Sequence, residues 1–237
     1  MDSTYGASYD TLYHQHWWWR SRERILLHEI EQLRLPRDAQ ILDVGCGNGL
    51  FLEPLSQFGD VHGIEVDETL LAPDNPFRDR IRTRPLGDPG YRKDRYDLIT
   101  ACDVIEHIED DKHAVAEMVR MLKPGGYLLI TVPAFRVLWD VHDEVNHHFR
   151  RYHHNELRQL LEPLIELQTC RYLFASLFLP KLAVKMLNAN RHSTVAQHAL
   201  PPSWVNRAAT EFCCAEYRLT QRVLPPFGTS LLAIGRA

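Results

Sequence analysis

Apolar residues along this chain group into two kinds of segment. Some segments are short and almost continuously apolar, which is typical of buried strands; they are residues 41–44, 61–66, 96–101 and 127–132. Others repeat their apolar residues at helical spacing; they are residues 12–35, 50–58 and 112–122. Strands that alternate with helices in this order predict an α/β fold, in which a parallel sheet carries helices on both faces.

The second half of the chain continues this pattern less regularly. It predicts a helix at 155–161, a strand at 165–172 and a final strand at 230–235. The long segment at about 174–226 lies between two strands, so we interpret it as an insertion over one end of the sheet. Within it, Pro180 interrupts a helical pattern and is expected to start a second helix. The length of 237 residues favours one domain over the whole chain, 1–237.

A glycine-rich loop joins the first strand to the next helix. It reads Asp43-Val44-Gly45-Cys46-Gly47-Asn48-Gly49. Glycines at these positions let the backbone turn sharply and approach a ligand closely. Glu65 ends the next strand, where a carboxylate can accept two hydrogen bonds from a ribose diol. The spacing G-x-G-x-G differs from the G-x-G-x-x-G of dinucleotide-binding proteins, so the loop disfavours NAD.

Several segments, in family order, resemble the class I S-adenosylmethionine (SAM)-dependent methyltransferases. They are the glycine loop, Gly63-Ile64-Glu65-Val66-Asp67, Leu86-Gly87-Asp88, 96–108 and 122–128. The resemblance is densest over 41–155. It implies a Rossmann-like sheet of seven mostly parallel strands whose last strand, 230–235, is antiparallel. It also implies that SAM is the cofactor and that methyl transfer is the reaction.

The resemblance further implies roles for individual residues. The loop glycines would line the methionine part of SAM, and Glu65 would bind the ribose hydroxyls. Val66 would cover the adenine and Asp88 would meet its amino group. Cys102 and Asp103 would face the sulfonium from the fourth strand. The full set of expected cofactor residues is Asp43, Gly45, Cys46, Gly47, Gly49, Glu65, Val66, Asp88, Cys102, Asp103 and Arg22.

The N-terminal helix, 12–35, begins near three consecutive tryptophans. Tryptophans in this position favour burial of their large side chains against the sheet. In the methyltransferases that the chain resembles, such a helix covers the SAM pocket. Arg20 or Arg22 would then pair with the methionine carboxylate. Both interpretations of this helix, burial alone and a cover over the pocket, stay open.

A histidine-rich segment at 139–154 follows the fifth strand. Ligands of such sheets bind at the carboxyl ends of the strands, so this segment is expected to border the acceptor pocket. His142, Asp143 and His148 are its candidate proton acceptors. The pattern H-D…H-x-R-R-Y resembles that of methyltransferases in ubiquinone and natural-product biosynthesis. Phosphate binding through Arg150 and Arg151, and a solvated loop, are the alternatives.

Other polar groups near these segments receive structural interpretations. His153 and His154 are expected to face solvent. Glu106 and His107 are interpreted as a helix N-terminal acid beside a structural histidine, and a catalytic role for the pair is the alternative. No metal site is expected, because nothing in the sequence fixes the three or four ligands that such a site requires.

Composition narrows the class of partner. Lys and Arg number 27 against 31 Asp and Glu, for a net charge of −4, which argues against a nucleic-acid partner. The N-terminus shows no basic segment followed by an apolar one, and five cysteines imply no disulfide framework. We therefore expect a reducing compartment, the cytoplasm. No apolar run approaches the ~18 residues of a transmembrane helix.

The sequence thus predicts methyl transfer from SAM to a small-molecule acceptor, with oxygen slightly preferred over nitrogen or carbon. An RNA or protein methyltransferase and a non-catalytic SAM-binding interaction protein are the alternatives. The insertion at 174–226 either packs on the sheet edge or forms a lid whose apolar face, with Phe174 and Phe178, favours a hydrophobic acceptor. Contact with a membrane surface is a weaker variant, since Lys181 and Lys185 supply little charge.

Overall fold

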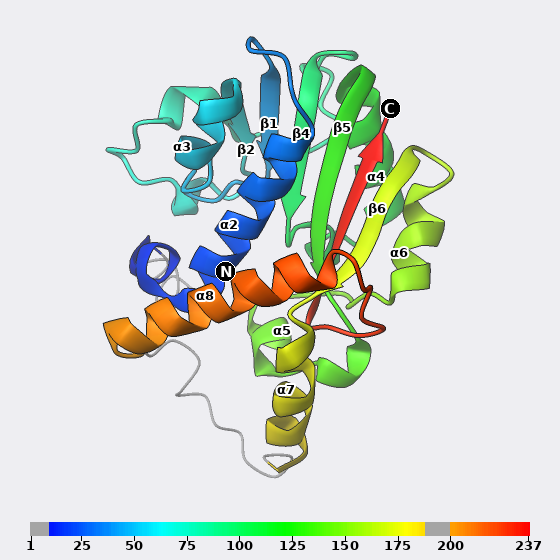
Figure 1. Ribbon diagram of the computed structural model, residues 1–237. Coiled ribbons are helices and arrows are strands. Elements are labelled where there is room, and N and C mark those ends of the chain that lie inside the picture. The colour runs from blue at the N-terminus through cyan, green and yellow to red at the C-terminus, as the bar shows by residue number, and fades with distance from the viewer. Residues whose placement is uncertain (1–9, 188–199) are drawn as a thin grey trace.

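The computed structural model describes residues 10–187 and 200–237, and a seven-stranded sheet forms its centre (Figure 1). The strand order is β3-β2-β1-β4-β5-β7-β6. The strands are β1 (Gln40–Val44), β2 (Asp60–Ile64), β3 (Ile81–Arg82), β4 (Tyr96–Cys102), β5 (Leu122–Pro133), β6 (Glu166–Leu173) and β7 (Ser230–Arg236). Strand β7 is antiparallel to both of its neighbours, and the other pairings are parallel. The predicted fold class is confirmed.

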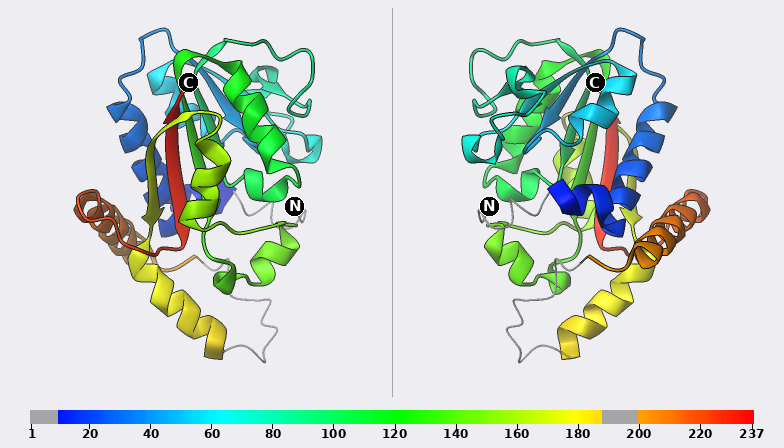
Figure 2. Two further views of the ribbon diagram at one scale, coloured as in Figure 1. Left: turned by 90° about the vertical axis from the view of Figure 1, so that its right-hand side faces the viewer. Right: turned by 90° about the vertical axis from the view of Figure 1, so that its left-hand side faces the viewer.

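Helices cover both faces of this sheet (Figure 2). One face carries α2 (Trp17–Gln32), α3 (Leu52–Leu55) and α8 (Ser203–Thr220), and the other carries α4 (Asp111–Met121) and α6 (His154–Leu161). Successive strand residues point to opposite faces. Ile41 therefore joins the cluster under α2, while Leu42 joins the cluster under α4. Burial of both faces explains why the central strands are almost continuously apolar.

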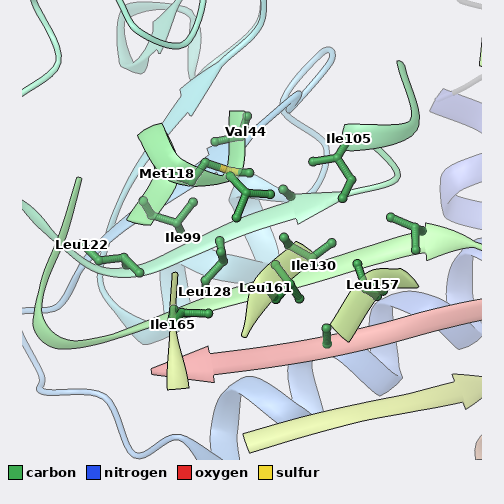
Figure 3. Packing of buried hydrophobic residues seen from close by; sticks show 14 of the residues in the cluster. Val44, Ile99, Ile105, Met118, Leu122, Leu128, Ile130, Leu157, Leu161 and Ile165 are labelled. Atoms are coloured by element: carbon green, nitrogen blue, oxygen red, sulfur yellow. The ribbon is translucent and has the colours of Figure 1, made fainter. Parts of the chain in front are cut away.

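The core between the sheet and α4 is shown in Figure 3. Ile99 and Ile130 project from neighbouring strands toward Met118 of α4, and Leu157 of α6 closes the same layer. None of these four side chains is exposed. The parallel strands are thereby held in register, and their carboxyl ends meet at one edge of the molecule.

The predicted N-terminal helix at 12–35 is divided in two. Residues 10–15 form a separate helical turn, and α2 begins after His16. The backbone of His16 is extended, and its ring nitrogen Nδ1 accepts a hydrogen bond from the amide of Trp18 at 3.2 Å. His16 thus caps α2, which ends the first helix and starts the second.

The early helix α2 and the late helix α8 lie against each other (Figure 1). The amide of Trp17 donates to Oδ1 of Asn206 at 2.9 Å, and the Tyr217 hydroxyl donates to Glu29. Asn206 therefore satisfies a free amide at the N-terminus of α2, although it is far away in sequence.

The segment after β6 forms one helix, α7 (Ala175–Leu187), where two were predicted. Pro180 lies inside α7 rather than at the start of a second helix. Its missing amide removes one helical hydrogen bond, and the helix continues through it. Part of the predicted insertion, 188–199, lies outside the described residues. None of the helices in the described ranges is long and apolar enough to span a membrane.

Helix α7 leaves the sheet at the carboxyl ends of the parallel strands (Figure 1). The Lys181 ammonium lies 3.3 Å from the carboxylate of Asp140. The Lys185 ammonium donates to the carbonyls of Val137 at 2.8 Å and Trp139 at 2.6 Å. Both lysines are therefore used to fix α7 on the loop after β5.

Candidate active site

Three loop glycines turn the chain after β1. Gly45, Gly47 and Gly49 have φ values of 67°, 53° and 72°, in the left-handed region that favours glycine. A Cβ on Gly45 would lie 2.6 Å from the Val104 side chain, so this position is needed for packing. A Cβ on Gly47 would meet no atom within 4 Å. The backbone at Gly47 is therefore open on one side, where a ligand can approach it.

Glu65 follows β2 and is turned toward this loop. Its carboxylate accepts from the amide of Gly47 at 2.9 Å and from the amide of Asp67 at 2.9 Å, and the residue is 8% exposed. Each carboxylate oxygen keeps a further lone pair for a diol. The neighbouring Val66 is 62% exposed, an apolar surface beside the carboxylate.

Asp43 is buried beneath the loop. The Thr100 hydroxyl donates to its Oδ1 at 2.6 Å. Burial raises the pKa of Asp43 to about 7, against the opposing effects of Thr100 and Arg22. Buried Cys46 lies on the same loop, and its thiol also has a raised pKa because of burial. These two residues support the loop from within the core.

Arg22 reaches from α2 to the ends of β4 and β5. Its guanidinium lies 2.8 Å from the carboxylate of Asp103 and donates to the Thr131 hydroxyl at 2.9 Å. Burial raises the pKa of the adjoining Cys102 thiol to about 12, so this cysteine is neutral at pH 7. The expected sulfonium-facing residues and Arg22 are thus brought together.

Asp88 is occupied within its own turn. Its carboxylate accepts from the amide of Gly90 at 2.7 Å and lies 3.3 Å from the Arg84 guanidinium. The hydrogen bond from Gly90 lowers the pKa of Asp88.

A cluster of charged and polar groups forms around Asp143. Asp143 is fully buried and lies in the short helix α5 (Val141–Val145). Its carboxylate contacts His148 Nδ1 at 2.8 Å and Arg151 Nε at 2.7 Å, and it accepts from the amide of Asp140 at 2.8 Å. Burial raises the pKa of Asp143, but the hydrogen bonds from His148 and Arg151 outweigh it and lower the pKa. Asp143 is therefore an ionised group that orients His148.

The contact with Asp143 also defines the chemistry of His148. An ionised carboxylate can only accept, so Nδ1 of His148 carries the proton in this contact. In the neutral ring Nε2 then has the lone pair, which can take a proton or bind a ligand. The His148 side chain is 7% exposed.

His142 and the two arginines are held by other groups. Half-buried His142 contacts the Asn146 amide at 3.2 Å, and loss of hydration lowers its pKa. Arg151 is buried against Asp143, and Arg150 lies 2.8 Å from the carboxylate of Asp111. Both arginines are thus engaged within the protein, which disfavours the phosphate-binding alternative.

One of the two histidines expected in solvent is partly buried instead. His153 is exposed, but Nε2 of His154 lies 3.1 Å from the Cys170 carbonyl on β6. Because β6 is the edge strand of the sheet, its free carbonyl offers His154 a partner. The solvent-facing interpretation is therefore wrong for His154.

Glu106 was interpreted as a helix N-terminal acid, and it lies in the first turn of a short 3₁₀ helix, η4 (Ile105–His107). Glu106 is also fully buried, which the sequence did not indicate. The ring of His107 meets the ring of His148 edge-on, with centroids 4.5 Å apart. Although His107 is partly exposed, loss of hydration and the neighbouring His148 lower its pKa to about 4. The sequence places Glu106 and His107 at the end of the fourth-strand motif and His148 in the histidine-rich segment, and no pattern in it joins the two.

Aromatic side chains line the same end of the sheet. The ring of Phe178 on α7 lies 5.0 Å from Phe135 and 5.3 Å from Phe227 between centroids. Phe135 also stacks on Tyr172 at 5.0 Å. Phe174, expected on the lid, is only 4% exposed and belongs to the core.

Comparison with known proteins identifies related sequences. A family model described as "Methyltransferase domain" matches residues 18–166. The chain is 30% identical over 144 residues to the ubiquinone biosynthesis O-methyltransferase of Pseudomonas entomophila, covering 53% of this chain and 60% of that protein. The corresponding protein of Alkalilimnicola ehrlichii is 32% identical over 135 residues, with coverages of 48% and 53%. The matches span little more than half the length of these curated relatives.

Solved structures share the fold at low identity. A putative methyltransferase of Haloferax volcanii, in complex with the Trm112 methyltransferase activator, aligns with a TM-score of 0.63 at 17% identity, covering 99% of this chain and 94% of that one. The [4+2]-cyclase SpnF aligns with a TM-score of 0.57 at 19% identity, covering 90% and 80%. Such identities show the fold alone, which carries more than one chemistry.

The Asp143 cluster allows a test of stability. Asp143→Asn leaves the buried Arg151 without a counter-charge, and we expect a loss of about 3–5 kcal/mol in the free energy of unfolding at pH 7. The folded-state pKa is lowered, so this contribution should be present above the unfolded pKa of about 4 and should shrink as the pH falls below it. Urea unfolding at several pH values measures the difference.

The matched control for this measurement is Glu162→Gln, which removes the exposed Arg158–Glu162 pair. It should cost no more than about 1 kcal/mol. Equal losses in the two variants would contradict the role assigned to Asp143.

Proposed function

The chain belongs to the class I SAM-dependent methyltransferases, and on this premise we propose that it methylates an oxygen atom of a small, largely apolar acceptor. SAM supplies a methyl group already activated on a positively charged sulfur. The protein has to hold the acceptor oxygen in line with that group and exclude water. The ubiquinone biosynthesis O-methyltransferases among its relatives support oxygen as the acceptor atom.

The observation that carries the cofactor assignment is the open backbone at Gly47 beside the carboxylate of Glu65. The amide contact between these two residues, 2.9 Å, aims the carboxylate at the loop. We assign the ribose hydroxyls to Glu65, the adenine face to Val66 and the methionine part to the glycine loop. These residues therefore support SAM as the ligand of the loop.

The remaining cofactor residues take supporting roles in this proposal. Arg22, already bridging Asp103 and Thr131, is positioned to reach the methionine carboxylate. Cys102 and Asp103 border the sulfonium side. Asp88 is occupied in its own turn, so its assignment to the adenine amino group rests on the motif alone.

At the acceptor end, His148 is the residue that controls the acceptor proton. Asp143 orients it through Nδ1, so that Nε2 meets the acceptor. His142 is less suited, because Asn146 already contacts its ring. Of the three candidate bases in the sequence, we therefore retain His148 as the acting group and Asp143 as its positioning residue.

The aromatic group of Phe135, Phe178 and Phe227 supports an apolar acceptor. Phe178 lies on α7, Phe135 follows the end of β5, and Phe227 precedes β7. Apolar walls with a few polar groups are typical of small-molecule sites. In this proposal α7 is the lid over the acceptor, and Phe178 supplies its inner surface.

The cofactor assignment is tested by SAM affinity. Glu65→Ala should weaken SAM binding by about 1–3 kcal/mol, because the ribose hydroxyls lose their acceptor. Gly47→Val should block binding by filling the open side of the loop and by straining a left-handed backbone. Calorimetric titration gives the affinities, and circular dichroism checks the fold.

Glu68→Ala is the control for the cofactor variants, because Glu68 is exposed close to the same strand end. Its affinity for SAM should equal that of the wild type. Wild-type affinity in all three variants would remove the assignment.

The acceptor assignment is tested by turnover. His148→Ala should lower kcat by about 10²–10⁴-fold, since the acceptor proton is no longer controlled, while SAM affinity stays unchanged. His113→Ala changes an exposed histidine on α4 and should keep normal turnover. A normal kcat in His148→Ala would contradict the role of His148 and would mean that catalysis depends on proximity alone.

The lid is tested by acceptor specificity. Phe178→Ser should raise KM for an apolar acceptor and leave SAM affinity nearly unchanged, because only the acceptor wall is altered. Leu187→Ser, at a position 84% exposed on the same helix, is the matched control and should change neither. A parallel loss of SAM and acceptor affinity in Phe178→Ser would show that Phe178 belongs to the core.

A further inference from the structure

A side chain from late in the sequence caps the N-terminus of α2. The amide of Trp17 donates to Oδ1 of Asn206, on α8, at 2.9 Å. Nδ2 of Asn206 donates to the Pro201 carbonyl at 2.8 Å, and the residue is 8% exposed. The Thr210 hydroxyl donates to the backbone carbonyl of Asn206 at 2.9 Å. Asn206 is therefore fixed on its own helix, and it determines where α2 begins.

The first turn of α2 depends on caps of this kind. It contains no acidic residue, so no carboxylate there interacts with the positive end of the helix dipole. Two side chains accept from its first amides, namely the ring of His16 at Trp18 and the amide oxygen of Asn206 at Trp17. Because an unsatisfied amide at a helix start costs stability, loss of Asn206 would loosen this turn.

Two contacts connect this turn to Arg22. The hydroxyl of Ser21, which is 0% exposed, donates to the Trp17 carbonyl at 2.5 Å. The residue that Asn206 caps therefore also holds the residue before Arg22. The guanidinium carbon of Arg22 lies 5.4 Å from the centroid of the Trp18 ring, a cation–π contact. The direction in which Arg22 leaves the helix is thus set by the capped turn.

The guanidinium of Arg22 ends in an ordered polar group. It contacts Asp103 at 2.8 Å and Thr131 at 2.9 Å, the Thr131 hydroxyl lies 3.2 Å from Asp103, and the Arg22 side chain is 13% exposed. Asp103 has a φ of 57°, a backbone conformation that non-glycine residues adopt rarely and often at functional sites. An arginine that is already ordered binds an anion at a lower entropic cost.

We infer that Asn206 is a positioning residue of the cofactor site: its cap on Trp17 holds α2 where Arg22 meets the methionine carboxylate of SAM. The inference deepens the proposed function and rests on its assignment of Arg22. Asn206 acts only through α2, since its side chain is bonded to Trp17 and Pro201. The segment between β6 and β7, predicted as a lid or as packing on the sheet edge, thereby acquires a role at the cofactor.

The experiment compares two ligands on the full-length protein by calorimetric titration. S-Adenosylhomocysteine carries the amino-acid part of SAM with its carboxylate. 5′-Methylthioadenosine has the same nucleoside and a sulfur but lacks the amino-acid part. Arg22→Ala should weaken the binding of S-adenosylhomocysteine about 10–100-fold, because a charge-assisted contact is lost, and leave that of methylthioadenosine unchanged.

Asn206→Ala should weaken the binding of S-adenosylhomocysteine about 3–30-fold, because Arg22 is then ordered in only a fraction of the molecules. Methylthioadenosine should bind as to the wild type, which also shows that the variant folds. Asn206→Asp keeps an oxygen at the Trp17 amide and should restore wild-type affinity, although it too loses the Pro201 contact. Arg207→Ala, at an exposed neighbouring position on α8, is the matched control and should change neither affinity.

Three results would overturn the inference. They are equal weakening of both ligands in Asn206→Ala, wild-type affinities in that variant, and the same loss in Asn206→Asp as in Asn206→Ala. A double variant adds a further test, since Asn206→Ala should cause no additional loss once Arg22→Ala has removed the arginine that it positions. Independent losses that multiply would refute the positioning role and leave the assignment of Arg22 intact.

The failure of the proposed function gives a different result. An unchanged ratio of the two affinities in Arg22→Ala would refute the assignment of Arg22 to the carboxylate, and the inference with it. The expected affinities in a protein that methylates no acceptor oxygen would support the inference and refute the proposed acceptor.

Discussion

The buried carboxylate of Asp143 is the charge around which the acceptor side of the molecule is organised. It receives hydrogen bonds from Arg151, from His148 and from the amide of Asp140, so one group holds three parts of the histidine-rich segment. Arg151 also donates to the carbonyl of Ala134 at 3.3 Å, which joins this cluster to the end of β5. Because neither charge is stable alone in the interior, the cluster forms as a unit. The direction of the His148 ring is therefore set by its hydrogen bond to Asp143.

The sheet and its order could be predicted where the pattern is local and strong. Strands β1, β4 and β5 are buried on both faces, so their sequences are continuously apolar and easily recognised. Strand β3 has two residues, too few to produce a pattern, and it depends on pairing with β2. The prediction divided the helical pattern at 174–187 into two helices at Pro180. Local propensity does not reveal that Lys185 donates hydrogen bonds to two carbonyls on another loop, which helps to hold α7 as one helix.

The candidate site was predictable on the cofactor side and only partly on the acceptor side. The glycine loop and Glu65 follow one another along the chain. Gly47 and Glu65 can form their contact because β1 and β2 are neighbouring strands. The environment of Glu106 arises from long-range folding, when the loop after α5 closes over the turn after β4. No local pattern distinguishes such an acid from a helix-capping one, so its burial is visible only in three dimensions.

The attachment of α2 to α8 has a consequence for the order in which the molecule is completed during synthesis. The amide of Trp17 is capped by Asn206, Arg24 lies 2.6 Å from Glu211, and Glu29 accepts from a tyrosine of the same late helix. A ribosome releases α8 after all strands but β7 have emerged. Until then the nascent chain holds the glycine loop but lacks the partner that anchors the helix bearing Arg22. The helix that carries Arg22 therefore becomes fully ordered only late in synthesis, after α8 has emerged.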